Sequence, residues 1–211
     1  ATAAALEYGD YAITEAGFGA DLGAEKFYDI KCRKTGLQPD LTVLVVTLQA
    51  LKMHGGVALE DIKKPNIEGM ENGYWNLDKH VKNLQSFGQT VVIAFNKFAT
   101  DTAEEIDVLR KHCEEMGCGF AVNNAFAEGG KGAVELADLV VKTIDEHPSA
   151  PLYFAYKDDE PVEKKIEDVA FNLYGAGSVT LSDSAKAMID EIKKLGAENF
   201  PICIAKTQYS F

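Results

Sequence analysis

The sequence predicts an α/β fold with a mostly parallel sheet and helices on both faces of that sheet. Short apolar runs rich in Val and Ile alternate along the chain with longer amphipathic stretches, which is typical of this class. Three of the runs are continuously apolar, as expected for strands that are covered on both faces. The chain has 211 residues, 46% of them hydrophobic, and this is sufficient for a sizeable core.

Five short apolar runs are predicted to be the strands of this sheet. Each is bounded by polar or glycine-containing segments. The five are YAIT (11–14), LTVLVVT (41–47), TVVIAFN (90–96), GFAVNN (119–124) and PICIAKT (201–207). Because the carboxyl ends of parallel strands lie along one edge of an open sheet, we expect a ligand to bind at that edge.

Four amphipathic stretches are predicted to be helices, at residues 102–116, 131–147, 162–175 and 182–196. The first carries an apolar stripe formed by Ile106, Leu109, Cys113 and Met116. We expect Asp101 to be the N-cap of this helix and Gly117 to end it. Residues 53–76 show no sustained period and are predicted to be an irregular connection with at most a short helical turn. The alternation then resumes, which places a domain boundary near residue 78.

Charge and composition exclude several classes of function. The chain has 33 acidic and 21 basic residues, for a net charge of -12, so its surface should repel a nucleic-acid backbone. No apolar run approaches the roughly 20 residues that cross a bilayer. Four widely spaced cysteines indicate reduced thiols rather than a disulfide framework. We therefore expect a cytoplasmic protein with neither nucleic acid nor membrane as a partner.

His112, Cys113 and Cys118 lie close together in the sequence and raise the question of a metal site. Structural zinc sites use paired ligand spacings, and these are missing here. Cys113 also belongs to the apolar stripe of a predicted helix. We therefore interpret both cysteines as packing residues and expect no bound metal.

Neither of the two standard nucleotide-binding loops occurs in the chain, including in the glycine-rich segment after the first predicted strand. The phosphate-loop pattern G-x-x-x-x-G-K-[ST] is absent, because EGGKGAVE has Gly132 where Ser or Thr would stand. The dinucleotide pattern G-x-G-x-x-G also fails, because Leu22 stands where the glycine after Gly17 and Gly19 belongs. A ligand at this loop must therefore be held in another way.

An aromatic residue follows three of the predicted strands, namely Phe18, Phe98 and Phe126. Three exposed rings at the carboxyl edge could stack on a flat heterocycle, and stacking of a base on one aromatic ring contributes about 1–3 kcal/mol. The alternative is that all three rings lie in the core. The pattern alone favours this alternative, because Phe is buried far more often than it binds a ligand.

Several blocks of the sequence resemble one known family. In chain order they are TEAGFGADLGAEKF, DIKCR, ALKMHGG, NKFATDT, AEGGKG, YGA and AKTQYS. From about residue 5 to residue 211, the chain resembles the formate–tetrahydrofolate ligases, also called 10-formyltetrahydrofolate synthetases. The resemblance implies a fold related to the P-loop NTPases. It also implies that ATP phosphorylates formate and that N10 of tetrahydrofolate attacks the formyl phosphate, giving 10-formyltetrahydrofolate.

The resemblance also assigns residues. Phe98 and Phe126 match the aromatic pair that stacks on the pterin, and Val122 belongs to the same folate-binding region. The loop beside the nucleotide and the formyl phosphate matches Gly17, Phe18, Gly19 and Gly23, whose glycines allow the backbone to approach an anion closely.

Two positions depart from the family pattern. The family usually has Trp at position 126, so Phe126 offers less stacking area and no indole N–H donor. The family often has Arg where Gln49 stands, so one positive charge near the site is missing.

Three further residues have two interpretations each. His54 can contact a substrate or make a structural hydrogen bond. Asp101 can bind the amino group of the pterin, although the pattern favours its role as a helix cap. Trp75 is interpreted as a packing anchor or as part of a subunit contact.

The chain is expected to be one part of a longer ligase. It begins with Ala rather than Met, its last residues show no closing helix, and the phosphate loop of the family is missing. Residues 1–78 are then the end of the ATP-binding domain, and residues 79–211 are a second α/β domain that carries the stacking aromatics. No catalytic residue is assigned in the chain, which should be inactive alone.

The resemblance implies formate, tetrahydrofolate and ATP with Mg²⁺ as substrates, and a homotetrameric assembly. The alternative is a non-catalytic folate-binding or subunit-assembly module that lacks the ATP half.

Overall fold

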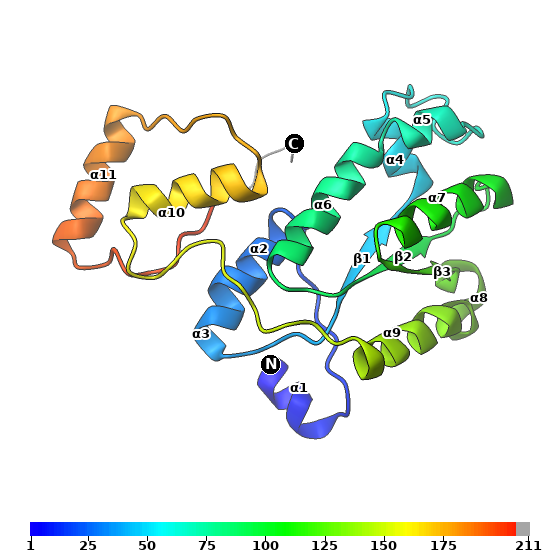
Figure 1. The fold of residues 1–211 in the computed structure, drawn as a ribbon, viewed down its shortest axis with the longest axis horizontal. Coiled ribbons are helices and arrows are strands. Elements are labelled where there is room, and N and C mark those ends of the chain that lie inside the picture. Colours follow the sequence, from blue (N-terminus) through cyan, green and yellow to red (C-terminus); the bar gives the residue numbers. More distant parts are fainter. Residues whose placement is uncertain (206–211) are drawn as a thin grey trace.

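The computed structural model describes residues 1–205 and is built around a parallel sheet (Figure 1). Three strands lie in the order β1-β2-β3, with bounds Thr42–Val46, Val91–Asn96 and Gly119–Asn123. The register pairs Thr42 with Val91 and Val92 with Gly119. The parallel sheet and three of the five predicted strands are therefore confirmed, each to within about one residue at its ends.

The other two predicted strands are wrong. Residues 11–14 belong to neither helix nor strand, and the side chain of Ile13 is 94% exposed. Residues 201–205 also form no strand, and residues 206 and 207 of that prediction lie outside the described part of the chain. An apolar run becomes a strand only where a neighbouring strand supplies hydrogen-bond partners, and among the described residues neither run has such a neighbour.

Three of the four predicted helices form close to their predicted bounds, and the fourth changes its geometry part-way along. Residues 102–116 contain α7 (Ala103–Glu115), and residues 182–196 contain α11 (Asp183–Lys194). Residues 131–147 contain α9 (Val134–Glu146), after a 3₁₀ turn η2 (Gly129–Ala133). The stretch 162–175 begins as α10 (Val162–Asp168) and widens into a π-helical segment η3 (Val169–Leu173).

The structure also contains helices that the periodicity did not reveal. A continuous helical segment runs from Gly23 to Thr35 as α2 (Gly23–Lys26), the π-helical η1 (Phe27–Cys32) and α3 (Arg33–Thr35). The region predicted to be irregular contains α5 and is flanked by two further helices. The remaining bounds are α1 (Thr2–Tyr8), α4 (Leu48–His54), α5 (Ile67–Glu71), α6 (Tyr74–Ser86) and α8 (Ala125–Glu128).

Helix α7 begins with a capping box rather than with the predicted aspartate. The Thr102 hydroxyl accepts from the backbone N–H of Glu105, whose carboxylate in turn accepts from the backbone N–H of Thr102. Asp101 precedes the cap and instead accepts a 2.8 Å hydrogen bond from the backbone N–H of Phe98. The predicted N-cap was therefore wrong by one residue, whereas Gly117 follows the helix with φ of 74° as predicted.

Helices cover both faces of the sheet. Val91, Ile93 and Phe95 of β2 belong to the main core, together with apolar residues of α6 and α7. Val92 points to the opposite face, because side chains alternate along a strand. There a Cβ on the neighbouring Gly119 would lie 3.3 Å from Leu139 of α9, so α9 packs closely on this face. The prediction of helices on both faces is confirmed.

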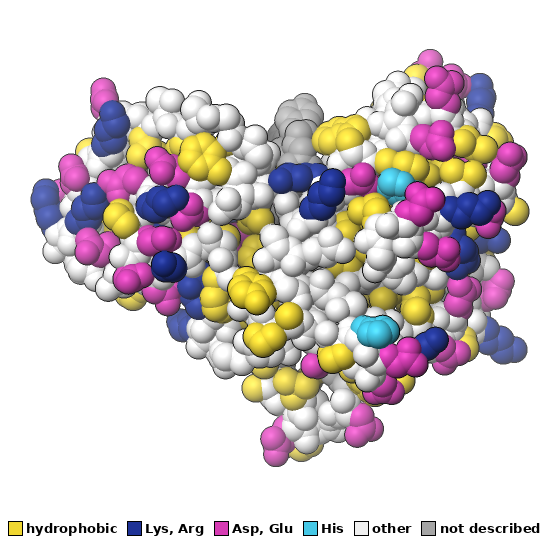
Figure 2. Space-filling model, in the orientation of Figure 1, with side chains coloured by type: hydrophobic (Ala, Val, Ile, Leu, Met, Phe, Trp, Pro, Cys, Tyr) yellow, Lys and Arg dark blue, Asp and Glu magenta, His cyan; other side chains and the backbone are white. Residues whose placement is uncertain are grey.

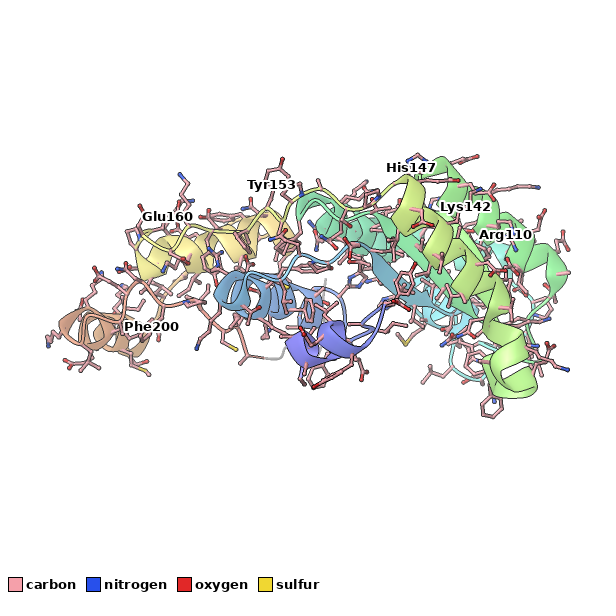
Figure 3. The ribbon with its side chains drawn as sticks, turned by 90° about the horizontal axis from the view of Figure 1, so that it is seen from below. Arg110, Lys142, His147, Tyr153, Glu160 and Phe200 are labelled. Carbon is pink, nitrogen blue, oxygen red and sulfur yellow. The ribbon has the colours of Figure 1, made fainter. Side chains whose placement is uncertain are left out.

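The molecule is elongated, with the sheet towards one end (Figure 3). Arg110 and Lys142 mark α7 and α9 at that end, whereas Glu160 and Phe200 mark the region of α10 and α11 at the other end. The connection between them passes His147 and Tyr153 along one side of the molecule. The predicted boundary at residue 78 falls within α6, and the division into two domains stays a prediction.

Acidic side chains are distributed widely over the face of the molecule shown in Figure 2, on both the α10–α11 region and the helices around the sheet. Basic side chains are interspersed among them, and apolar side chains gather nearer the middle. Within residues 1–205, none of the helices combines the length and the apolar character that a membrane span requires.

Candidate functional site

The carboxyl ends of β2 and β3 are fixed side by side. Asn96 ends β2 and pairs in register with Asn123, which ends β3, and the Asn123 amide N–H donates to the Asn96 amide oxygen at 2.8 Å. The backbone N–H of Lys97 donates to the Asn123 carbonyl at 3.1 Å. Strands in a sheet lie about 4.8 Å apart. The two loops that follow them therefore start from neighbouring positions.

These two loops carry the predicted pterin-stacking aromatics. Phe98 lies two residues beyond Asn96 and is 45% exposed, and Phe126 lies three residues beyond Asn123 on α8 and is fully exposed. Val122 is partly buried at the end of β3, where it packs against the core. Leaving Phe side chains in water sacrifices about 1.5–3 kcal/mol of burial free energy each. The core interpretation favoured by the pattern is therefore wrong for both rings, and they are available to a ligand.

The loop that bears Phe98 has a buried ionic support. Lys52 of α4 lies 2.6 Å from the carboxylate of Glu105, and each side chain is only 1% exposed. Lys52 also donates to the Lys64 carbonyl at 2.8 Å, and Glu105 accepts from the backbone N–H of Asn66 at 2.8 Å. The Lys52–Glu105 pair thus joins α4, the connection before α5 and the start of α7. The Phe98 loop lies immediately before α7.

The loop that bears Phe126 depends on a close backbone approach. The Gly132 carbonyl accepts from the backbone N–H of Asn124 at 2.9 Å, and a Cβ at position 132 would lie 2.4 Å from the Asn124 carbonyl oxygen. Gly129 has φ of 62°, in the left-handed region. Gly132, which breaks the phosphate-loop pattern, is therefore required by the packing of this loop.

The Phe18 loop has an unusual backbone. Phe18 has φ of 66° and is the one non-glycine residue with positive φ among those that the structure describes. Its side chain is 76% exposed. The left-handed conformation costs a bulky residue about 1–2 kcal/mol, and such strain is concentrated at functional sites. The loop therefore holds an aromatic ring outside the core at the expense of backbone strain.

A cavity of about 510 Å³ lies beside this loop. One wall is formed by residues 15–18 and by the start of the Gly23–Thr35 helical segment, and the other wall by residues 203–205. Lys26 and Lys31 contribute two positive charges to the lining, and Glu15 contributes one negative charge. Of the four residues predicted at this loop, Gly17, Phe18 and Gly23 line the cavity. The Gly19 carbonyl accepts from the backbone N–H groups of Leu22 and Gly23 and so closes the turn.

Comparison with known proteins decides the family. The family described as "Formate--tetrahydrofolate ligase" matches residues 1–211. The chain belongs to this family. It is 63% identical over 211 residues to the formate–tetrahydrofolate ligase of Bacteroides thetaiotaomicron and 64% identical to that of Bacteroides fragilis. The enzyme of Porphyromonas gingivalis is 58% identical. All 211 residues align in each case, and the chain spans 38% of the length of each of these ligases.

Packing accounts for the remaining histidines and cysteines that the sequence raised as candidates. His54 packs edge-on against Trp75, with ring centroids 5.9 Å apart, and burial holds the pKa of His54 below its ordinary value. His112 hydrogen-bonds the carboxylate of Asp78 at 2.7 Å and stacks on Tyr74. Cys113 and Cys118 are buried thiols. No group of three or more His, Cys, Asp or Glu side chains in residues 1–205 is arranged to hold a metal ion.

Three features of this site were not predicted from the sequence. The left-handed backbone of Phe18 has no signal in the residue type, because glycine or asparagine would be expected there. The Lys52–Glu105 pair joins residues far apart in sequence, and so nothing in the sequence indicates it. Lys26 and Lys31 line the Phe18 cavity because the helical segment Gly23–Thr35 carries both of them. That helical segment was not predicted.

Gly23→Ala is expected to destabilise the Phe18 loop, whereas Gly17→Ala is expected to be tolerated. A Cβ at position 23 would lie 1.8 Å from the carbonyl oxygen of Gly17, and nothing lies within 4 Å of a Cβ at position 17. Overpacking of this kind costs about 1–3 kcal/mol. Thermal unfolding of the two variants measures the difference. Equal melting temperatures for the two variants would contradict the close approach.

Proposed function

We propose that this chain is the folate-side portion of an ATP-dependent ligase that joins formate to tetrahydrofolate. The observation that carries the proposal is the pair of exposed rings, Phe98 and Phe126, on neighbouring loops at the carboxyl edge of the sheet. A pterin is a flat bicyclic heterocycle, and two aromatic faces offer it stacking on both sides. The family assignment supplies the substrate class.

The proposed reaction has two steps. An oxygen of formate attacks the γ-phosphorus of ATP, and ADP leaves, which forms formyl phosphate. N10 of tetrahydrofolate then attacks the formyl carbon, inorganic phosphate leaves, and the N10 proton passes to solvent. In this scheme Phe98, Phe126 and Val122 hold the pterin and orient N10, and orientation of this kind lowers the barrier of a two-substrate step. We assign no proton-transfer or nucleophilic role to a residue of this chain.

The Phe18 cavity is proposed to lie against the formyl phosphate or the nucleotide. Its apolar walls and the two lysines suit a ligand with a flat ring and a negative charge. Mg²⁺ accompanies ATP in phosphoryl transfer, where it neutralises developing charge. Within residues 1–205, no group of three or more His, Cys, Asp or Glu side chains is placed to hold this ion.

Domain division, location and assembly complete the proposal. Residues 1–78 would end the ATP-binding domain, and residues 79–211 would form the domain that binds folate. The complete enzyme would be a cytoplasmic homotetramer. The alternative of a non-catalytic module has no specific observation in its favour, because the relatives named above are all ligases.

The test uses the complete polypeptide that contains this chain. Repeated turnover to ADP should require formate, ATP and tetrahydrofolate together, and 10-formyltetrahydrofolate should accumulate in an amount equal to the ADP. Tight folate binding without formate-dependent ADP formation would instead support the non-catalytic module.

Phe126→Trp is expected to bind tetrahydrofolate about 2- to 10-fold more tightly, because the indole has a larger face for stacking. Calorimetric titration of tetrahydrofolate into the complete protein measures the dissociation constant. An unchanged or higher dissociation constant for the Trp variant would argue against stacking at this position.

A further inference from the structure

Three acidic residues are buried along one side of the helical segment that walls the Phe18 cavity. Asp21 lies just before the segment, and Glu25 and Asp29 lie within it. Their spacing of four residues places Glu25 and Asp29 on the same face of the helix. Burying several ionised carboxylates together is unfavourable unless charge or protons compensate. The arrangement therefore requires an explanation.

The carboxyl groups of Glu25 and Asp29 are both buried, and each perturbs the pKa of the other, as expected for two groups that share a hydrogen bond; the other Glu25 oxygen, Oε2, lies 3.7 Å from Lys26 Nζ. Two ionised carboxylates cannot form such a bond, because both are acceptors only. Glu25 Oε1 and Asp29 Oδ2 are buried, and neither has a donor among the described residues. A single proton between the two groups gives each of them a partner.

Asp29 also anchors a segment that is distant in sequence. Asp29 Oδ1 accepts from the backbone N–H of Ala155 at 2.9 Å and from Arg33 Nη2 at 3.1 Å. Arg33 donates to the Tyr156 carbonyl at 2.8 Å, and its guanidinium lies over the Tyr156 ring. The Tyr156 hydroxyl in turn accepts from the backbone N–H of Ile202 at 3.1 Å. An unbroken chain of contacts thus runs from the carboxyl pair to Ile202.

This series of contacts connects the two walls of the Phe18 cavity. Ile202 is followed directly by residues 203–205, which form the far wall. Gly23 and Lys26, on the near wall, belong to the same helical segment as the carboxyl pair.

We propose that Glu25 and Asp29 share one proton, and that this proton fixes the two walls of the Phe18 cavity relative to each other through Tyr156 and Ile202. The proton resides on Glu25 and is donated to the Asp29 carboxylate, whose charge Arg33 offsets. When the proton passes to solvent, two like charges remain in a buried site, and their repulsion weakens the Asp29 contacts that anchor the 154–158 segment. Glu25 and Asp29 are positioning residues here, and the inference holds for any ligand of the cavity.

The titration of the pair sets the pH range of this device. Burial and the neighbouring Asp29 raise the pKa of Glu25 to about 8. Burial also raises the pKa of Asp29, to about 6, although the Ala155 N–H and Arg33 oppose this. The other ionisable groups that act on the pair or respond to it are Lys26 and Arg33 of the same segment, Tyr156 of the anchored segment and Tyr174 after η3. Asp158, which pairs with Arg33, and Asp21, which acts on Tyr174, complete the surroundings.

A raised pKa in the folded state fixes the sign of the effect. The stabilisation from the shared proton is complete below the unfolded pKa of Glu25, near 4.5. It is lost as the pH rises through about 8. The cavity walls should therefore loosen in mildly alkaline solution.

Amide hydrogen exchange in the complete polypeptide that contains this chain tests the proposal without a ligand. The N–H groups of Ala155 and Ile202 report the near and far ends of the contact chain. After correction for intrinsic exchange rates, their protection should fall together above pH 8, by roughly tenfold per pH unit. The N–H of Gly69, which donates to the Asn66 side chain, should keep its protection and serves as the internal control.

Two variants separate the proton from the packing. Glu25→Gln keeps a donor but cannot ionise, so protection of Ala155 and Ile202 should no longer depend on pH. Glu191→Gln, at an exposed position, should behave like the original protein. Tyr156→Phe should expose the Ile202 amide at every pH and leave the pH dependence of Ala155 intact. Flat protection in the original protein, an unchanged profile in Glu25→Gln, or a protected Ile202 in Tyr156→Phe would each overturn the proposal.

Discussion

Replacement of Phe98 or Phe126 by alanine should weaken tetrahydrofolate binding to the complete ligase by about 5- to 150-fold for each ring. This range corresponds to the loss of about 1–3 kcal/mol of stacking free energy per aromatic face. Both rings are exposed, so their removal leaves no cavity in the core. The measurement is a titration of tetrahydrofolate against each variant, together with the melting temperature, which should change little.

Phe200→Ala is the matched control for this experiment. Phe200 is also an exposed phenylalanine, and it lies at the α10–α11 end of the molecule, away from the sheet (Figure 3). Its removal should leave the folate dissociation constant unchanged. If Phe98→Ala and Phe126→Ala bind folate as tightly as the Phe200 variant does, the two rings do not form the pterin site.

The strands that the sequence predicted correctly are those that have neighbours in the sheet. Continuous apolar runs at β1, β2 and β3 indicated strands covered on both faces, and the structure pairs them in parallel. The expected cover is wrong for one face of β1, where Val43 and Val45 are 40% and 58% exposed. The run at residues 11–14 has a similar composition but remains unpaired among the described residues. A sequence pattern reports which residues suit a strand, whereas pairing depends on neighbours that are distant in the chain.

Local signals located the ends of α7 and the site loops only in part. The pattern placed Gly117 correctly after α7, because a left-handed C-terminal position favours glycine. It placed the N-cap at Asp101 although Thr102 was adjacent, because Asp and Thr both serve as caps and only the Glu105 contact distinguishes them. The placement of Phe98 and Phe126 on one edge followed from the strand positions. Their exposure did not follow, because the pattern describes residue types and not the surroundings of a loop.

The buried pair of Lys52 and Glu105 could not be predicted at all, and it should carry one of the largest stability effects in the chain. Lys52→Met removes the cation and leaves Glu105 buried without its partner. Breaking a buried ion pair in this way costs about 3–5 kcal/mol. For a chain of this size, we expect the melting temperature to fall by roughly 10 °C. Lys64→Met, which removes a lysine exposed on the same connection, is the control and should have little effect.

The pH dependence of stability identifies the ion pair as the cause. Burial raises the pKa of Glu105, but the contacts from Lys52, Asn66 and Thr102 outweigh burial and hold the pKa below its ordinary value. The stabilisation from this pair is therefore present above pH 4.5 and is lost as the pH falls through the lowered pKa. Lys52→Met should flatten this acid-side loss, and the double variant Lys52→Met/Glu105→Gln should be less destabilised than the sum of the single variants. Strict additivity in urea unfolding experiments would show that the two side chains act independently, and the support of the Phe98 loop would then have to come from elsewhere.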